Sequence, residues 1–320
     1  MKKLSVIFIL FSLPAAAQFD PPAGQTASLS VYKDSSAVKA WATGCEVQRG
    51  YQDISNTSLG LATSGTVQMV LGASNSGVLS LGDGGSAVLT FATAIVNGDG
   101  ADFAVFENSF SDDYLELAFV EVSSDGINYF RFPASSNTQT AVQVGGFGTL
   151  DATKLHNLAG KYRAQYGTPF DLEELKDEVN LDVNNILYVK VIDAVGSINS
   201  SFATYDSRDS MVNDPWPTPF PSSGFDLEAV AVLHAAPAAV LENESALFSM
   251  YPNPSSAVLN VQCVKNDFHE VLITDADGRI FAEYSGNGSF TLDVSMYPAG
   301  LYFLQFKSIN TVGVGKFSKI

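Results

Sequence analysis

Between residues 19 and 234 the chain consists of short apolar runs separated by glycine, proline, asparagine and aspartate. Several of these runs alternate apolar and polar positions, which is the period of a strand with one buried face. Ser124 to Asn128 contains an Asp-Gly pair and predicts a hairpin turn. The pattern therefore predicts an all-β unit. Its clearest strands are 86–91, 103–106, 117–123, 187–192 and 227–233.

One segment of this unit has helical character. Asp171 is placed as an N-cap and Glu174 follows three residues later, which is the spacing of a capping box. Leu172, Leu175 and Val179 then fall on one face of the helix. A β-sandwich with one short helix in a crossover fits this order, and the jelly roll is the most common such architecture. We therefore expect a jelly-roll-like sandwich.

Residues 247–320 repeat the strand pattern on a smaller scale. Val271 to Ile273 runs into Asp275 to Gly278, where glycine can take a positive φ and close a hairpin onto Arg279. Further alternating or apolar runs follow at 289–294 and 301–306. The natural packing is a small immunoglobulin-like sandwich of about seven short strands.

Four motifs occur in order within this C-terminal part. They are Tyr251-Pro252-Asn253-Pro254, Asp275 with Gly278-Arg279, Pro298 with Gly300 and Tyr302, and the basic end Lys316 to Lys319. Residues 247–320 thereby closely resemble the type A C-terminal sorting domain of the type IX secretion system. The resemblance implies export across an outer membrane by the type IX secretion machinery, usually followed by removal of the domain. An ordinary immunoglobulin-like terminal module is the alternative.

The N-terminus predicts export independently. Met1 to Lys3 is positively charged, Leu4 to Leu13 is apolar but too short to span a bilayer, and Ala15 to Ala17 is a small-residue cleavage site. Residues 1–17 are therefore a predicted signal peptide, with Gln18 as the mature start. No later run approaches ~18 apolar residues, so we expect no transmembrane helix. The expected location is the outer cell surface or the medium.

A linker separates the two predicted β units. Residues 235–240 are alanine, proline and valine, and residues 242–245 are polar, a composition typical of segments between domains. The expected organisation is therefore a β-sandwich at 18–234, a linker at 235–246 and the sorting domain at 247–320. The two cysteines, Cys45 and Cys263, fall in different units, and an interdomain disulfide is not expected.

The charge balance limits the partners of the chain. Asp and Glu number 34 against 17 Lys and Arg, which gives a net charge of -17. Nucleic acid and anionic membrane surfaces are poor partners for such a chain. Divalent cations are better ones, because hard ions bind clustered carboxylates and backbone carbonyls. A surface that keeps an exported protein soluble is the alternative explanation.

A second resemblance covers residues 40–234. Short motifs in this order resemble those of a group of bacterial cell-surface proteins of poorly known function, whose fold is similar to the galactose-binding, discoidin-like jelly roll. The group offers no established catalytic residues to transfer. The motifs are 82–85, 97–108, 120–126, 189–193 and 224–230.

Five acidic residues are candidate metal ligands: Asp99, Asp102, Glu107, Asp193 and Asp226. Asp102, Asp193 and Asp226 lie where predicted strands meet loops, so we expect them to converge on one rim of the sandwich. Together with backbone carbonyls they would hold Ca²⁺, which takes six to eight oxygen ligands. The alternative is that aspartate beside glycine only forms turns and strand ends.

The loop from Tyr205 to Phe225 is a candidate ligand platform. Its members with suitable chemistry are Asp206, Asp214, Trp216 and Phe220, and prolines around Trp216 stiffen it. Rigid aromatic faces beside carboxylates are typical of sugar-binding sites. The alternative is that the loop folds back and its aromatic residues cover the end of the core.

The motifs of common enzymes do not occur in the sequence. His156, His234 and His269 are scattered without metal-binding spacing, and no nucleophile elbow or phosphate loop occurs. We therefore expect a non-catalytic surface or secreted binding protein for a glycan, a nutrient or a surface protein, with calcium as the candidate stabilising ion. The alternative is a glycan-active hydrolase that pairs Glu107 with Asp193 or Asp226.

Overall fold

The computed structural model describes residues 19–75, 77–236, 247–264, 266, 268–308 and 311–320. The predicted signal peptide and residues 237–246 of the predicted linker lie outside these ranges. The chain divides into two compact units, residues 1–236 and 237–320. Among the described residues, no helix has the length and apolar character needed to cross a membrane.

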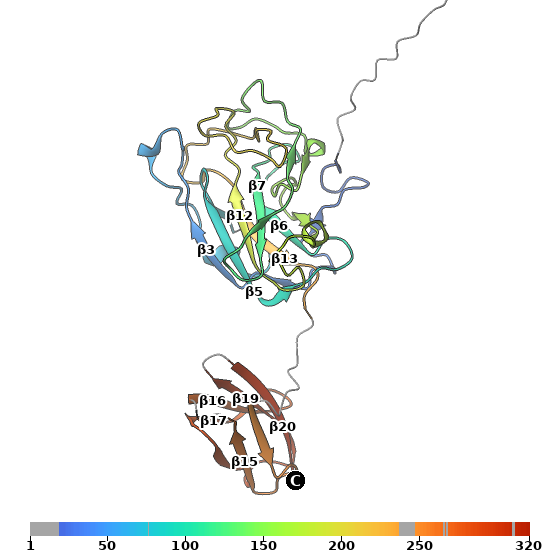
Figure 1. Ribbon diagram of the computed structural model, residues 1–320, viewed down its shortest axis with the longest axis vertical. Coiled ribbons are helices and arrows are strands. Elements are labelled where there is room, and N and C mark those ends of the chain that lie inside the picture. The colour runs from blue at the N-terminus through green and yellow to red at the C-terminus, as the bar shows by residue number, and fades with distance from the viewer. Residues whose placement is uncertain (1–18, 76, 237–246, 265, 267, 309–310) are drawn as a thin grey trace, which may run out of the picture. The chain divides into compact units, whose positions relative to one another are not determined.

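The first unit is built from two antiparallel sheets (Figure 1). One sheet has the order β3 (Gly44–Gln48), β5 (Ser86–Ile95), β12 (Ile186–Asp193), β7 (Ala118–Ser123) and β8 (Phe130–Arg131). The other has the order β1 (Val31–Tyr32), β11 (Tyr166–Phe170), β6 (Phe103–Glu107), β13 (Asp226–Val232) and β2 (Ala40–Trp41), and β4 (Leu79–Ser80) also pairs with β13. A separate two-stranded sheet joins β9 (Ser135–Ser136) to β10 (Leu155–His156).

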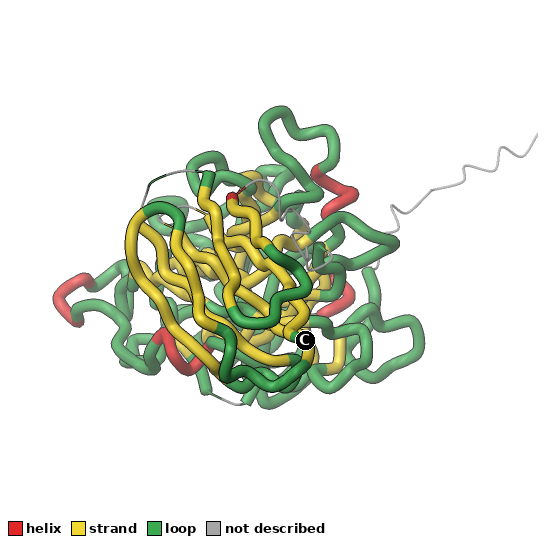
Figure 2. Tube along the Cα trace, turned by 90° about the horizontal axis from the view of Figure 1, so that it is seen from below, coloured by secondary structure: helices red, strands yellow, loops and turns green. Residues whose placement is uncertain are grey.

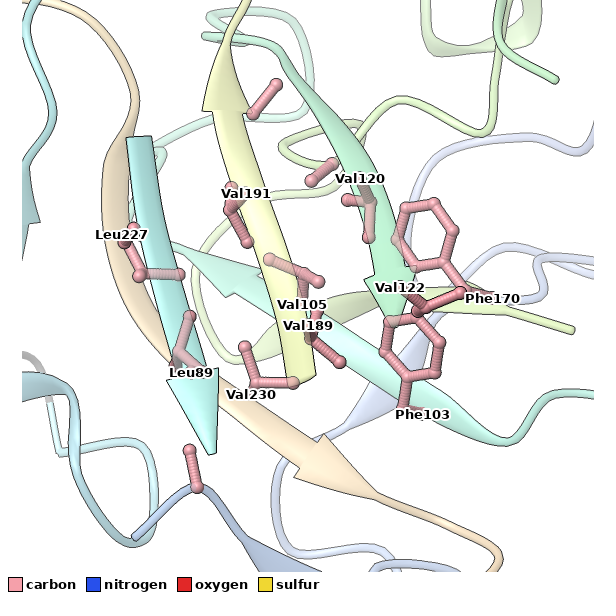
Figure 3. Close-up of a cluster of buried hydrophobic side chains, with 14 of the residues drawn as sticks. Leu89, Phe103, Val105, Val120, Val122, Phe170, Val189, Val191, Leu227 and Val230 are labelled. Carbon is pink, nitrogen blue, oxygen red and sulfur yellow. The ribbon is translucent and has the colours of Figure 1, made fainter. Parts of the chain in front are cut away.

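Alternation explains why these segments form strands. In β5 the buried positions include Ala87 and Leu89, which lie opposite Val191 and Val189 of β12 and so share one face with them. All four side chains belong to the core between the sheets. Figure 3 labels Leu89, Val189 and Val191. Strands β6 and β13 are buried on both faces, which accounts for their continuous apolar runs.

The all-β fold class is confirmed. All five strands expected in the first unit are present, and the turn at 124–128 joins β7 to β8. Strands β5, β6, β7, β11, β12 and β13 alternate between the two sheets along the chain, as successive strands of a jelly roll do. The likeness to the discoidin-like group stays a prediction.

The predicted helix is present, but it is one short turn. Asp171 accepts a hydrogen bond from the N–H of Glu173, and residues 172–175 form a 3₁₀-helix with Leu172 and Leu175 buried. Val179 does not continue this face, because its side chain is 77% exposed beyond the end of the helix. One short helix was expected, and the described residues contain four. These 3₁₀-helices are η1 (Thr57–Leu59), η2 (Val67–Val70), η3 (Ala152–Lys154) and η4 (Leu172–Leu175).

The second unit is a small β-sandwich, as predicted. One sheet has the order β14 (Phe248–Tyr251), β15 (Val258–Cys263) and β18 (Phe290–Asp293). The other has the order β17 (Ile280–Asn287), β16 (Phe268–Asp275), β19 (Gly300–Ser308) and β20 (Thr311–Lys319). Figure 2 shows that strands and loops make up nearly the whole described chain, with helices only as short segments.

The predicted hairpin between β16 and β17 is closed by its aspartate and glycine. The carboxylate of Asp275 accepts hydrogen bonds from the N–H groups of Asp277 and Arg279, at 3.0 and 2.9 Å. Gly278 has a φ of 81°, a conformation that other residues adopt only with strain. The local sequence therefore sets the register of this hairpin.

Candidate functional site

Acidic side chains gather at one end of the first unit. Strand β6 ends at Glu107, β12 ends at Asp193 and β13 begins at Asp226. Glu107 lies opposite Leu227 across the β6–β13 ladder, so these ends coincide. In Figure 1 the long loops of the unit gather beyond the arrowhead of β12, which is this end.

Three further carboxylates join them. Asp83 precedes β5, Glu116 precedes β7, and Asp214 lies in the loop between β12 and β13. All are buried, and burial, with a contribution from the charges of Asp83 and Asp193, raises the pKa of Glu116 and of Asp214. We name the following set the acidic cluster: Asp83, Glu107, Glu116, Asp193, Asp214 and Asp226.

The sequence analysis did not select Asp83 or Glu116 as site residues. Asp83 was visible only as part of the Gly82-Asp83-Gly84-Gly85 motif, a pattern that turns commonly share. Glu116 lies between Leu115 and Leu117 in the sequence. An acidic residue within an apolar run was the available signal that its side chain would be buried.

Asp99 and Asp102 lie away from the cluster, contrary to the prediction of one shared rim. Strands β6 and β13 are antiparallel, so Asp102 at the start of β6 lies near the end of β13. The carboxylate of Asp102 accepts hydrogen bonds from Gly98 and Leu172 and lies 2.8 Å from Nδ1 of His234. Burial raises the pKa of Asp102. Asp99 is exposed in the preceding loop.

Members of the acidic cluster fasten loops through main-chain N–H groups. Asp193 accepts hydrogen bonds from Phe225 and Gly84, at 2.7 and 2.9 Å. Asp214 accepts one from the N–H of Leu117 at 2.9 Å. The cluster therefore connects segments that are far apart in the sequence.

Asp83 accepts hydrogen bonds from the N–H of Ile54 and from Nε1 of Trp216, both at 2.9 Å, and three other members also make polar contacts. Glu107 accepts a hydrogen bond from the N–H of Ser109 at 2.8 Å, and Asp226 pairs with the hydroxyl of Ser80. Glu116 lies 3.5 Å from the hydroxyl of Tyr114, the limit of a hydrogen bond. One carboxylate of the cluster is therefore weakly bonded.

Burial and mutual repulsion disfavour negative charge in this cluster. Burial raises the pKa of Asp193 to about 8, and the nearby charge of Asp83 adds to the effect. Burial also raises the pKa of Asp226 to about 6, although Ser80 and Arg49 act in the opposite direction. The pKa of Glu107 rises well above its ordinary value because of burial and of the charge on Glu116.

No basic side chain neutralises these acids directly. Within the described part of the chain, none of the six carboxylates forms a salt bridge. Arg49 is the nearby cation, but its guanidinium donates to the carbonyls of Ser64, Gly65 and Ser80. Arg49 therefore offsets only part of the negative charge that the cluster carries when its carboxyl groups are ionised.

A small cavity lies among four members of the cluster. Asp83, Glu116, Asp193 and Asp214 line it together with Trp216, and its volume is about 10 Å³. That is the room needed for a single water molecule, and a monosaccharide does not fit. No three His, Cys, Asp or Glu side chains in the described ranges are already placed to hold a metal ion. Carboxylates would therefore have to turn inward to ligate one.

Exposed aromatic side chains lie close to the acidic cluster. Phe110, Phe147 and Phe220 are 79%, 78% and 45% exposed, and we name them the aromatic rim. Phe110 stacks on Tyr114 at 4.8 Å between ring centroids, and Phe147 lies 6.2 Å from Phe220. The hydroxyl of Tyr114 also lies 3.3 Å from the carbonyl of Gly146, which ties the two pairs together.

The residues of the predicted ligand loop divide between the interior and the surface. Trp216 is partly buried and donates from Nε1 to Asp83 at 2.9 Å, while Phe220 is exposed in the aromatic rim. Asp214 belongs to the acidic cluster. Asp206 is turned inward and accepts N–H groups of Ser136, Arg208 and Ser210. Its burial acts to raise its pKa, but these hydrogen bonds outweigh burial and lower it.

The comparison with protein families concerns the second unit. Residues 249–319 match the family described as the secretion system C-terminal sorting domain. This part of the prediction is confirmed, and it implies export to the cell surface or beyond. No curated protein sequence matched the chain.

Solved structures add only a general likeness. A DUF3244 family protein with an immunoglobulin-like β-sandwich fold from Bacteroides vulgatus is 20% identical, covering 23% of this chain and 84% of its own, with a TM-score of 0.21. A β-glucuronidase from Parabacteroides merdae is 9% identical over 89% of this chain and 35% of its own, with a TM-score of 0.22. One from Ruminococcus gnavus is 12% identical over 95% and 48%, also with a TM-score of 0.22. This chain therefore spans less than half of either glucuronidase.

The sorting domain joins its opening motif to its basic strand. The side chain of Asn253 donates to the carbonyl of Lys316 and accepts from the N–H of Ser318, both at 3.0 Å. The hydroxyl of Tyr302 donates to the carbonyl of Pro298 at 2.9 Å. Motif residues that are distant in sequence are therefore bonded partners in the folded domain.

Proposed function

We propose that the first unit is a non-catalytic binding module that the type IX secretion machinery exports through residues 247–320. Its ligand, a glycan, would bind across the aromatic rim, with one calcium ion in the acidic cluster beneath. The observation that carries this proposal is the ion-sized cavity among four buried carboxylates beside three exposed phenylalanines.

The buried negative charge of the acidic cluster is the reason for proposing a bound cation. Ionised carboxylates are costly to bury unless a positive charge compensates them, and no salt bridge does so here. Oxygen-rich sites of this kind are those that Ca²⁺ prefers. Asp214 accepts its main-chain hydrogen bond from Leu117 through Oδ2, which leaves Oδ1 to face a cation. It is therefore a suitable first ligand.

The exposed phenylalanines of the aromatic rim are the reason for proposing a glycan as the ligand. Phenylalanine rings exposed as fully as Phe110 and Phe147 expose apolar surface to water, and stacking on the apolar face of a sugar would cover it. The neighbouring carbonyl of Gly146 supplies an acceptor for a hydroxyl group. The small cavity excludes the sugar itself from the cluster, so the ligand would lie above it.

A thermal-shift comparison in Ca²⁺ and in chelator tests the cation. At a Ca²⁺ concentration of ~100 times Kd, binding to the folded state adds about 2.7 kcal/mol. For a unit of this size the Tm should rise by about 5–11 °C. Asp214→Asn keeps a carbonyl for Leu117 but removes the charge, so it should lose at least half of the shift. Asp177→Asn, at an exposed position, should keep it. Equal Tm values in Ca²⁺ and chelator would remove the cation from the proposal.

A glycan-active hydrolase is the second candidate, because burial raises the pKa of Glu107 as it does for general acids. Glu107 is buried, and the cavity of the cluster admits no sugar ring. Assays with aryl glycosides decide between the two candidates. Turnover by the wild-type chain that disappears in Glu107→Gln would establish hydrolysis, whereas glycan binding without turnover supports the binding module.

A further inference from the structure

A second cavity lies elsewhere in the first unit and shares no residue with the acidic cluster. Its volume is about 300 Å³, at the small end of the range for ligand pockets. It lies where β11 ends and the loop before β6 passes. Its polar walls include Asp20, His156, Asn157, Lys161, Thr168, Asp171 and Glu174.

The buried hydroxyl group of Thr168 has no hydrogen-bond partner among the described residues. Thr168 is 3% exposed. Buried hydroxyl groups in native proteins are nearly always bonded to protein or to another molecule. Because Thr168 lines the cavity, an occupant of the cavity is the natural partner.

Charges of both signs are fixed in the walls. Lys161 is 2% exposed and pairs with Asp20, which also accepts from the hydroxyl of Tyr162. Glu174 accepts a hydrogen bond from Asn157 at 2.7 Å. Lys161 would oppose a cationic occupant, while Asp20, Asp171 and Glu174 would oppose an anionic one.

The other residues that line the cavity add a hydrogen-bonding imidazole and apolar surface. His156 is stacked on Phe19 at 4.9 Å, and burial together with Lys161 lowers the pKa of its imidazole, which favours the neutral form. A neutral imidazole has one donor and one acceptor nitrogen. Ala101 and Pro169 add apolar surface.

We propose that this cavity binds a neutral polyol of hexose size. Each hydroxyl of a sugar both donates and accepts, so it matches donors and acceptors that stand side by side. The C–H face of the ring would lie on the apolar wall, and one hydroxyl would bond Oγ1 of Thr168. The site is additional to the rim of the proposed function and does not depend on it.

Titration calorimetry of the purified chain with glucose, galactose and mannose tests the site. At least one of these sugars should bind, and its counterparts glucosamine and glucuronate should bind ~10-fold more weakly or not at all. Thr168→Val keeps the volume of the side chain and removes the hydroxyl. It should weaken sugar binding by ~10-fold, the worth of one hydrogen bond.

Controls separate this site from folding and from the aromatic rim. Thr168→Val should leave the Tm unchanged or raised, because Oγ1 has no protein partner to lose. Thr57→Val, at an exposed position, should bind sugar like wild type. The inference is overturned if none of the three sugars binds or if Thr168→Val binds like wild type. Loss of binding in Phe110→Ala alone would also overturn it and would instead support the rim.

Discussion

Replacement of Asp193 by asparagine tests the electrostatic reasoning about the acidic cluster. The pKa of about 8 in the folded protein lies about four above the ordinary value of 3.8. Between pH 5 and 8 the folded protein keeps a proton that the unfolded chain has released. The free energy of unfolding therefore falls with rising pH, by about 1.4 kcal/mol per pH unit, or about 4 kcal/mol over this range. Asp193→Asn removes this contribution.

The variant also has a cost. Its single carbonyl oxygen can accept from Phe225 or from Gly84 but not from both, and one unsatisfied N–H costs about 1–3 kcal/mol. We therefore expect Asp193→Asn to be less stable than wild type at pH 5 and equal or more stable at pH 8. The two stability curves should cross between these values.

Urea denaturation in chelator, repeated at intervals between pH 5 and 8, measures both curves. The slope of the unfolding free energy against pH should differ between wild type and Asp193→Asn by about 1.4 kcal/mol per pH unit. Asp177→Asn, at an exposed position outside the acidic cluster, serves as the control and should follow wild type. Parallel curves for wild type and Asp193→Asn would refute a proton held by Asp193 in the folded protein.

Other expected outcomes concern the rim and the sorting domain. Phe110→Ala and Phe147→Ala should change the free energy of unfolding by no more than ~0.5 kcal/mol, because both rings are exposed, yet weaken binding on a glycan array. Retained glycan binding in the double variant would argue against the rim. Asn253→Ala should destabilise the sorting domain by about 1–3 kcal/mol, because it loses two hydrogen bonds to β20. Less protein should then reach the medium, and normal export with a normal Tm would contradict this role.

Alternation along the chain was enough to predict the strands, because it directly records which face is buried. The runs at 86–91 and 187–192 lie within β5 and β12 as expected. Local chemistry likewise predicted the hairpin at Asp275 and the cap at Asp171. The length of the helix was not predictable in this way, since Val179 had the right spacing but no core to pack against.

The candidate site was only partly predictable, because strand ends were known but their pairing was not. Asp102, Asp193 and Asp226 all lie at strand ends, and only the antiparallel register of β6 with β13 separates Asp102 from the other two. Burial of Asp83 and Glu116 depends on loops that close over them from distant segments. Such contacts leave no local pattern in the sequence.

The main-chain bonds of Asp193 and Asp214 also bear on how chains of this type can diverge. These two side chains anchor the segments at Gly84, Leu117 and Phe225 from the interior of the sandwich. The exposed residues 139–142 and 207–209, which lie between such anchors, can then change in sequence without moving the points where their loops leave the sheets. Descendants of one scaffold would acquire new specificities by substitution in these segments while every anchoring aspartate stayed in place.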